Sequence, residues 1–225
     1  MPEPIHSLTV DALFDLTHTL AAPLLQEVTY PWEALDGLGA YIALLGQTLP
    51  AREYDHPAPT VWIHKTARVF DSAYFGENVI IGAEAEVRHC AFIRGNALVG
   101  AGAVVGNSTE LKNVILFDGV QVPHYNYVGD SVLGYKAHMG AGAITSNVKS
   151  DKTPVAVRAD GTVIETGRKK FGAMLGDLVE VGCGSVLNPG TVIGRRTRVY
   201  PLSSVRGAVP ADSIYKKQGE IARQL

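Results

Sequence analysis

The sequence predicts an all-β protein, a parallel β-helix of six-residue repeats with a small α-helical N-terminal cap. Three observations support this fold. A bulky apolar residue returns at every sixth position from Ile63, a small residue stands four positions after most of these, and glycine often follows them directly. Glycine accounts for 24 of the 225 residues and is the one outlier in an ordinary globular composition.

The repeat is too long to be accidental. Its first nine apolar positions are Ile63, Val69, Phe75, Ile81, Val87, Ile93, Val99, Val105 and Leu111. Slips of one residue lead to Leu116, Val122 and Val128 and then to Leu133 and Met139, and the pattern resumes as Leu175, Val181, Leu187, Ile193, Val199 and Val205. Three hexads would close one triangular coil, and stacked coils bury the apolar ladder that a single coil leaves exposed. We therefore expect the β-helix to occupy residues 61–210.

Residues 1–60 follow helical spacing instead. Apolar residues cluster from Val10 to Leu16 and again from Trp32 to Leu45, and Pro31 and Pro50 bracket the second group. We expect a helical cap over the open N-terminal coil, whose exposed strand edges would otherwise invite aggregation.

A second break covers residues 146–170. Alternating residues surround Asp160-Gly161 there, which predicts a β-hairpin. A long insertion at one level of a solenoid usually lies on the functional face. The tail, residues 211–225, is expected to form a short closing helix.

The bulk composition excludes several classes of protein. A net charge of −2 with interspersed signs argues against a nucleic-acid or anionic-membrane binder. The sequence holds no apolar run long enough to span a membrane and no recognisable signal peptide. The two cysteines, Cys90 and Cys183, form no CxxC pair, so we expect a reducing, cytoplasmic setting without disulfides.

Polar side chains concentrate between ladder residues from Glu110 to Asn147. Three runs in this segment resemble a known protein family. They are Glu110-Leu111-Lys112, Pro123-His124-Tyr125-Asn126-Tyr127-Val128-Gly129-Asp130 and Met139-Gly140-Ala141-Gly142. Residues 60–210 resemble the acetyltransferase half of the bacterial bifunctional glucosamine-1-phosphate acetyltransferase/N-acetylglucosamine-1-phosphate uridylyltransferase, and the C-terminal domains of archaeal sugar-phosphate nucleotidylyltransferases. The resemblance implies a left-handed coil, which the residue count alone does not.

The resemblance also implies an acetyl-CoA-dependent N-acetyltransferase that acts on an amino-sugar phosphate such as glucosamine 1-phosphate. His124 falls on the family's general base, a role that suits a side chain with a near-neutral pKa. Asn147 matches a family residue that lies beside the reacting amine. Ala141 matches the family residue whose backbone N–H polarises the thioester carbonyl. Each also has a plain structural reading: a corner histidine, a turn asparagine and a repeat alanine between repeat glycines.

Further residues match ligand contacts of that family. Arg94, Lys112 and Tyr127 match contacts to the sugar phosphate, and Arg94 and Lys112 stand three hexads apart, which places them on adjacent coils. Lys152 is a candidate for another phosphate contact. For coenzyme A we expect contacts from Ala141, from Gly182 and Cys183, and from Arg168, Lys169 and Lys170, although the cations are equally typical of a solvated surface.

Two positions depart from the family pattern. His138 replaces an asparagine that contacts the sugar, and Val148 replaces an aromatic residue after the Asn147 position. These changes keep a second hypothesis open, a non-catalytic module that binds a sugar phosphate or nucleotide sugar. Residues 1–60 are too short for a nucleotidyltransferase domain and carry no glycine-rich phosphate loop.

Assembly and metal content complete the expectations. The resemblance implies a homotrimer with active sites between subunits. We expect no metal ion, because His89, His124 and His138 lack the H-x₄-H spacing of the zinc enzymes that share this fold.

Overall fold

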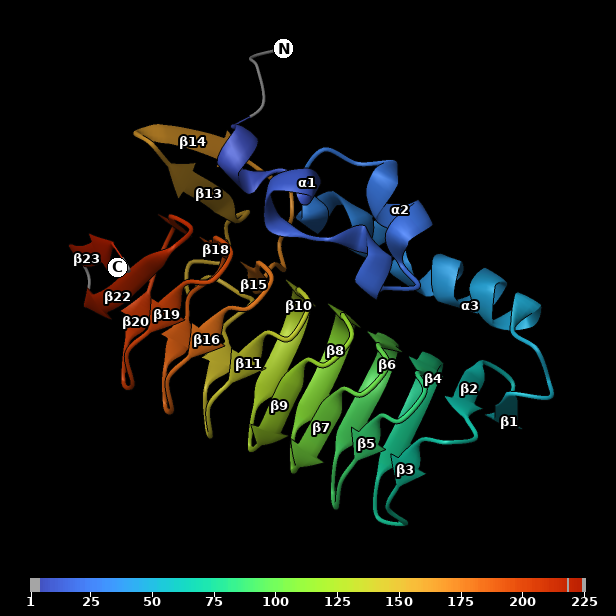
Figure 1. Ribbon diagram of the computed structural model, residues 1–225. Helices are drawn as coiled ribbons and strands as arrows, with labels where there is room; N and C mark the ends of the chain where they lie inside the picture. Colours follow the sequence, from blue (N-terminus) through green and yellow to red (C-terminus); the bar gives the residue numbers. More distant parts are fainter. Residues whose placement is uncertain (1–4, 218, 224–225) are drawn as a thin grey trace.

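A computed structural model describes residues 5–217 and 219–223 of the chain. Parallel strands stack into one long solenoid that runs from residue 61 to residue 217 (Figure 1). The stacked strands confirm the predicted parallel β-helix. The left-handed winding remains a prediction from the resemblance.

Two large sheets wrap around the solenoid. The first contains β1 Tyr54–Ala58, β2 Val61–His64, β4 Tyr74–Ile81, β6 Phe92–Val99, β8 Glu110–Leu116, β10 Tyr127–Leu133, β12 Ile144–Thr145, β15 Ala173–Leu175, β17 Val186–Leu187, β18 Thr191–Ile193, β20 Ser204–Val205 and β21 Ala208–Val209. The second contains β3 Arg68–Val69, β5 Glu86–Val87, β7 Val104–Asn107, β9 Gln121–His124, β11 His138–Met139, β16 Glu180–Val181, β19 Arg198–Val199, β22 Ser213–Lys217 and β23 Glu220–Arg223.

The predicted apolar ladder forms the core. In the second sheet Val87 pairs with Val105 on the next coil, and Val105 pairs with Val122. All three side chains are fully buried. The change from 18 to 17 residues per coil at this point is the one-residue slip seen in the sequence.

The first sheet covers two faces because its long strands bend. A residue with positive φ interrupts each of β4, β6, β8 and β10 at the same level, and these residues are Asn78, Asn96, Asn113 and Asp130. Asparagine and aspartate tolerate this left-handed backbone better than most residues. They form the Asp130 corner. We call the half of the sheet that precedes this corner the Tyr127 face, and the half that follows it the covered face.

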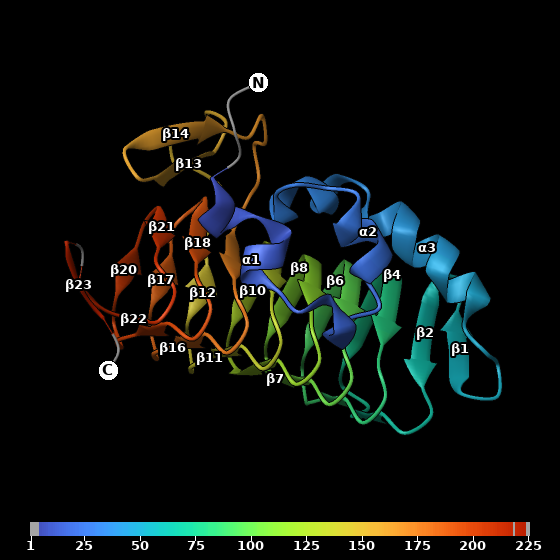
Figure 2. The ribbon, with the colours of Figure 1, turned by 45° about the horizontal axis from the view of Figure 1, so that its top comes forward.

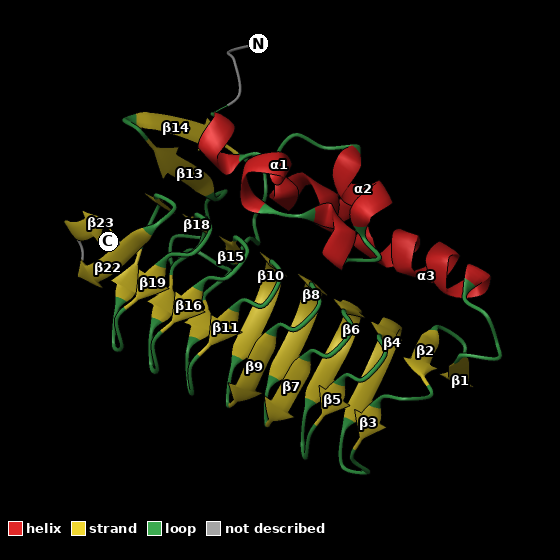
Figure 3. Ribbon diagram, in the orientation of Figure 1, coloured by secondary structure: helices red, strands yellow, loops and turns green. Residues whose placement is uncertain are grey.

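The N-terminal segment is helical, as predicted. Its elements are η1 His6–Leu8, α1 Val10–Leu13, η2 Leu16–His18, α2 Ala22–Gln26, η3 Pro31–Asp36 and α3 Leu38–Thr48. The predicted position, over the N-terminal coil, is wrong: the segment lies along one flank of the solenoid (Figures 2 and 3). Helix α3 contacts β4, β6 and β8, and η3 contacts β10.

The outward residues of the covered face explain this position. They are apolar on coil after coil, and Ile80, Leu98, Ile115, Val132 and Met174 are all fully buried. A helix over the first coil would have left this second ladder in water. The edge of the first coil is instead closed by β1, which pairs with β2 in the antiparallel sense. The sheet therefore begins before the predicted boundary at residue 60.

The insertion and the tail gave one correct prediction and one wrong one. Strands β13 Ala156–Ala159 and β14 Thr162–Glu165 form the predicted hairpin, with Asp160 and Gly161 as its two-residue turn. The tail does not form the predicted closing helix within its described residues. Strands β22 and β23 pair as an antiparallel hairpin, which covers the last coil with hydrogen-bonded backbone. Residues 218, 224 and 225 of the predicted helix lie outside the described residues.

In the part of the chain that the structure describes, no helix is long and apolar enough to cross a membrane.

Candidate active site

His124, Ala141 and Cys183 lie at the same corner on three successive coils. The Gly142 N–H donates to the His124 carbonyl at 3.0 Å, and the Gly184 N–H donates to the Ala141 carbonyl at 2.9 Å. All three named residues are exposed. The structure thus brings together the predicted base His124, the predicted oxyanion donor Ala141 and the predicted coenzyme A contact Cys183. We call this edge the His124 corner; it separates the Tyr127 face from the second sheet.

A buried asparagine fixes the backbone of this corner. Asn126 is 2% exposed, and its Nδ2 donates to the carbonyls of Gly140 and Ala143, each at 2.9 Å. Its Oδ1 accepts from the His124 N–H at 3.1 Å. Asn126 therefore ties the His124 turn to the turn that carries Ala141.

The ring of His124 is exposed and unpaired in the described part of the chain. It makes no hydrogen bond or ion pair within the described residues, and the residue is exposed at the end of β9. An exposed imidazole without a structural partner does not fit the plain reading of a corner histidine that bonds a neighbouring coil.

A second group of predicted residues converges at the Asp130 corner. Asn147 Nδ2 donates to Asp130 Oδ2 at 2.6 Å and to Tyr127 Oη at 3.1 Å. Lys112 Nζ donates to Asp130 Oδ1 at 2.8 Å, and the Asp130 side chain is 3% exposed. We call these four residues the Asp130 cluster. Burial and the nearby carboxylates of Asp130 and Glu110 raise the pKa of Tyr127, so its hydroxyl stays protonated near neutral pH.

Arg94 extends the cluster by one coil. Strands β6 and β8 are paired with a one-residue register shift at Arg94, because Ile93 pairs with Leu111 whereas Gly95 pairs with Lys112. Arg94 and Lys112 therefore stand on adjacent coils, as predicted. Arg94 Nη1 contacts Glu110 Oε1 at 2.9 Å, and this hydrogen bond raises the pKa of Arg94 further. The guanidinium is half-exposed and faces solvent.

The basic residues of the insertion lie at the Asp130 corner. Arg168, Lys169 and Lys170 line a hollow of about 430 Å³ together with Asp36 and Asp130. Arg168 Nη1 is 2.6 Å from Asp36 Oδ2, which links the insertion to the N-terminal segment. Within one chain, these cations do not meet Gly182 and Cys183, the other predicted coenzyme A contacts, which lie on the far side of the Tyr127 face.

Lys152 and Val148 make no side-chain contact with the cluster among the hydrogen bonds and ion pairs of the described residues. Lys152 is exposed with a positive φ in the insertion, where its N–H donates to the Lys149 carbonyl at 3.0 Å. Val148 is 42% exposed, directly after Asn147.

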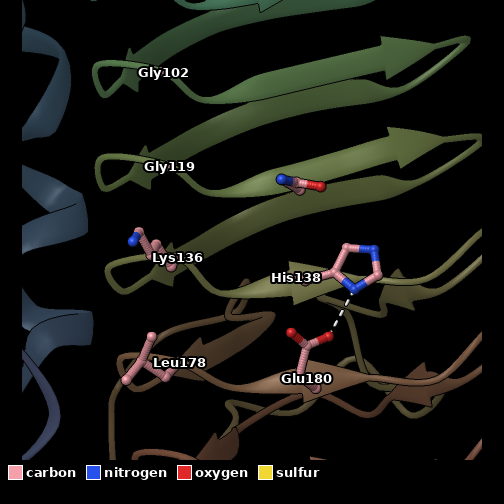
Figure 4. Close-up of a pocket in the computed structure, with 7 residues that line it drawn as sticks. Gly102, Gly119, Lys136, His138, Leu178 and Glu180 are labelled. Carbon is pink, nitrogen blue, oxygen red and sulfur yellow. Dashed lines mark hydrogen bonds and ion pairs between the residues drawn. The ribbon is translucent and has the colours of Figure 1, made fainter.

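His138 lies on the second sheet, in a hollow of about 540 Å³ (Figure 4). Its Nδ1 lies 2.8 Å from Glu180 Oε2 on the neighbouring strand β16. Gln121, Lys136 and Leu178 also line this hollow. We call this side of the solenoid the His138 face. One chain alone does not place His138 beside Asn147.

Neither metal binding nor a disulfide is evident in the described residues. They include no group of three or more histidine, cysteine, aspartate or glutamate side chains that could hold a metal ion. Both cysteines are free and exposed.

Three residues that matter here received no role from the sequence. Asp130 and Asn126 belong to the run from Pro123 to Asp130, but neither was assigned a function. Glu180 is 42 positions from its partner His138 in the sequence. Asp130 had a usable signal, since it is the only carboxylate in the corner series with Asn78, Asn96 and Asn113. Glu180 had none, because the insertion hides the register between coils.

Comparisons with known proteins identify a family and several relatives of this chain. A family model described as the GMPPB C-terminal domain matches residues 77–197, which is more than half of the chain. The bifunctional protein GlmU of Methanococcus vannielii is 34% identical over 131 residues, 58% of this chain and 31% of that protein. A bifunctional sugar-1-phosphate nucleotidylyltransferase/acetyltransferase of Sulfurisphaera tokodaii is 36% identical over 112 residues, 50% of this chain and 28% of that protein.

A relative of similar length also matches. An uncharacterized acetyltransferase of Escherichia coli, YaiX, is 30% identical in an alignment 180 residues long, which covers 71% of this chain and 78% of that protein. The chain thus spans about a third of the length of the two bifunctional relatives but most of the length of this one.

Proposed function

We propose that this chain, which belongs to the GMPPB C-terminal domain family, is an acetyl-CoA-dependent N-acetyltransferase. Its acceptor is an amino-sugar phosphate, with glucosamine 1-phosphate as the first candidate. One observation carries the proposal: the free ring of His124 stands one coil from Ala141 and two coils from Cys183. The names of the relatives supply the class of reaction, acetyl transfer.

His124 acts as the general base in this proposal. The acceptor amine attacks the thioester carbonyl, the N–C bond forms, and the ring nitrogen of His124 takes the proton that the amine loses. The C–S bond then breaks, and the same proton can pass to the departing thiolate. Acetyl-CoA supplies the activated acetyl group when it is bound.

The backbone N–H of Ala141 stabilises the oxyanion. It donates no backbone hydrogen bond within the described part of the chain, although its neighbours Gly140 and Gly142 both do. A free, fixed N–H at a corner is suited to a developing negative charge, because it needs no reorganisation when the charge forms. Asn126 holds this turn in place.

Arg94 recognises the acceptor's phosphate. Its guanidinium is half-exposed and can form two parallel hydrogen bonds to phosphate oxygens. Lys112 lies beside it, with its ammonium held by Asp130. We expect Arg94→Ala to raise KM for glucosamine 1-phosphate roughly tenfold or more, because charge-assisted hydrogen bonds contribute about 1.5–3 kcal/mol. KM for unphosphorylated glucosamine should change less than about twofold. An equal rise in KM for both acceptors would contradict a contact between Arg94 and the phosphate.

A complete site requires a second copy of the chain in this proposal. His124 and the Arg168–Lys170 cations lie at different corners of one chain, and His138 lies on a different face from Asn147. A homotrimer would pack the Tyr127 face of one subunit near the His138 face of the next and bring these groups together. Light scattering should give three times the 24.0 kDa chain mass; a monomer at micromolar concentration would contradict this assembly.

Release of free thiol from acetyl-CoA tests the enzyme proposal directly. The assay combines acetyl-CoA with a panel of amino-sugar phosphates, their unphosphorylated forms and nucleotide-linked amino sugars. We expect thiol release that depends on the acceptor. Tight binding of a sugar phosphate without thiol release would favour the non-catalytic binding module, for which the substitutions at His138 and Val148 are the motivation.

A further inference from the structure

The side chain of Asn147 has a fixed orientation. Its Nδ2 donates both of its protons, one to Asp130 Oδ2 at 2.6 Å and one to Tyr127 Oη at 3.1 Å. An ionised carboxylate only accepts hydrogen bonds, so the end of the amide that meets Asp130 must be the nitrogen. The carbonyl Oδ1 of Asn147 consequently points away from Asp130.

Asp130 is well placed to enforce this orientation. Its side chain is 3% exposed, and besides Asn147 it accepts from Lys112 Nζ at 2.8 Å and from Asn113 Nδ2 at 3.0 Å. A buried carboxylate is expensive unless it is paired and hydrogen-bonded, and these three donors meet that need. The ammonium of Lys112 therefore has a task besides any contact to phosphate.

The Oδ1 atom of Asn147 is the free end of this network. Within the described residues it accepts no hydrogen bond, and the residue is half-buried at the edge of the Tyr127 face. Tyr127 and Asn147 pack closely over the backbone of Gly129, which leaves no room for a side chain at position 129. A Cβ at Gly129 would stand 2.5 Å from Tyr127 Oη and 2.9 Å from Asn147 Nδ2.

We propose that Asp130 is a positioning residue, which turns Asn147 so that its Oδ1 accepts an N–H of the acceptor amine. The inference rests on the proposed function, because it takes the acceptor to be an amine. An amine offers N–H donors and keeps its lone pair for attack on the acetyl carbon. If the amide were reversed, its NH₂ group would face that lone pair and compete for it.

Exchange of the two side-chain types provides the test. In Asp130→Asn, the amide at position 130 can donate to Asn147 Oδ1, which allows Asn147 to reverse. In the double variant Asp130→Asn/Asn147→Asp, the amide at position 130 donates to one oxygen of the carboxylate at position 147. The other oxygen faces the acceptor again. Asn78→Gly, at the same corner three coils earlier, controls for disturbance of the corner.

We expect Asp130→Asn to lower kcat/KM for the amine at least about tenfold, the loss of roughly one good hydrogen bond to a charged or reacting group. The double variant should recover most of that loss, and Asn78→Gly should stay within about twofold of the parent. Thermal unfolding of each variant separates misfolding from misorientation. If the double variant folds like the parent and is no faster than Asp130→Asn, the positioning role is refuted and Asp130 only neutralises Lys112.

A second readout needs no turnover. Hydrogen exchange of the Asn147 side-chain NH₂, observed by NMR after ¹⁵N-asparagine labelling, should be slow in the parent and fast in Asp130→Asn. Exchange at the solvent rate in the parent would overturn the inference even if the protein acetylates amines. Slow exchange in a protein that transfers no acetyl group would instead overturn the proposed function and leave the orientation of Asn147 established.

Discussion

The covered face and the two open faces of the solenoid share one inward pattern and differ only in the residues that point outward. On the covered face the outward column is apolar and buried from Trp62 to Val192, and the N-terminal segment packs on its strands β4, β6, β8 and β10. On the Tyr127 face the outward column mixes apolar and polar residues, namely Tyr74, Phe92, Glu110, Tyr127 and Ile144. On the His138 face the outward column includes Gln121, His138, Glu180 and Arg198. The inward ladder therefore builds the coil, while the outward column decides what each face does.

This difference assigns the faces their roles. A face that is already covered by its own chain has no free surface for a substrate or a second subunit. Every predicted site residue outside the insertion lies on an open face or at a corner that borders one. The Asp130 corner is the place where both kinds of face meet, and there the insertion and the N-terminal segment reach the polar cluster through Arg168 and Asp36.

The largest effect on stability should come from the outward column of the covered face. Leu98 on β6 is fully buried beneath the N-terminal segment. Leu98→Ala should lower the free energy of unfolding by about 2–5 kcal/mol, the usual cost of a truncated core leucine. Phe92, on the same strand but 42% exposed on the Tyr127 face, is the matched control. Phe92→Ala should cost less than about 1.5 kcal/mol, mainly its contact with Tyr74. Equal losses in urea unfolding would abolish the distinction between the faces.

A single methyl group should damage the Tyr127 face selectively. Gly129→Ala forces Tyr127 and Asn147 to move, because the new Cβ would overlap both. We expect kcat for acetyl transfer to fall about a hundredfold, as small displacements of positioning groups can do. Gly37→Ala is the control, since a Cβ there meets its nearest atom, Leu24 Cδ1, at an ordinary 3.6 Å. A Gly129→Ala variant with the parent's kcat would show that this cluster does not support catalysis.

A smaller effect should follow from loosening the N-terminal segment. Asp177 accepts from the backbone N–H groups of Asp15 at 2.7 Å and Tyr135 at 2.8 Å, and its own N–H donates to the Leu13 carbonyl. Asp177→Ala leaves two N–H groups without a partner, which costs about 1–3 kcal/mol of stability. Proteolysis of residues 5–50 should quicken before the solenoid unfolds. Unchanged proteolysis would mean that apolar contact alone holds the segment.

The same residue predicts a dependence on pH. Burial raises the pKa of Asp177 above its ordinary value, despite opposing hydrogen bonds from Asp15 and Tyr135. The folded protein therefore holds this proton more tightly than the unfolded chain does. Its contribution to stability is greatest below the ordinary carboxyl pKa and is lost as the pH rises through the raised value. Asp177→Asn should remove this component from the pH dependence of unfolding; an unchanged profile would assign it to other groups.

The sequence was sufficient for the coil and insufficient for its surroundings. The spacing of Ile81, Val99 and Leu116 determines which side chains point inward, because one large residue per hexad must enter the core. The position of the helical segment depended on a second column, Ile80, Leu98 and Ile115, which lies one residue earlier and was equally visible in the sequence. The prediction of a helix in the tail was wrong because the last coil has a free strand edge that needs hydrogen-bonding partners. Strand β22 pairs with this edge, and β23 pairs with β22.

The candidate site divides in the same way. Residues within one ungapped stretch, such as His124 and Ala141, meet on adjacent coils because the register between coils is nearly constant. Contacts across the insertion, such as His138 with Glu180 and Arg168 with Asp36, depend on where the chain re-enters the solenoid. No periodicity in the sequence specifies that point.

The measurement that tests the central claim most directly is kcat for acetyl transfer to glucosamine 1-phosphate in His124→Ala, with His138→Ala beside it. The account predicts that His124→Ala loses roughly 10²–10⁴ in kcat, the usual contribution of a general base. Acetyl-CoA affinity should barely change, since the imidazole acts mainly in the transition state. His138, held by Glu180 on the other open face, should affect KM more than kcat. A His124→Ala variant that keeps more than about a tenth of kcat, while His138→Ala loses it, would place the base on the His138 face and contradict the account.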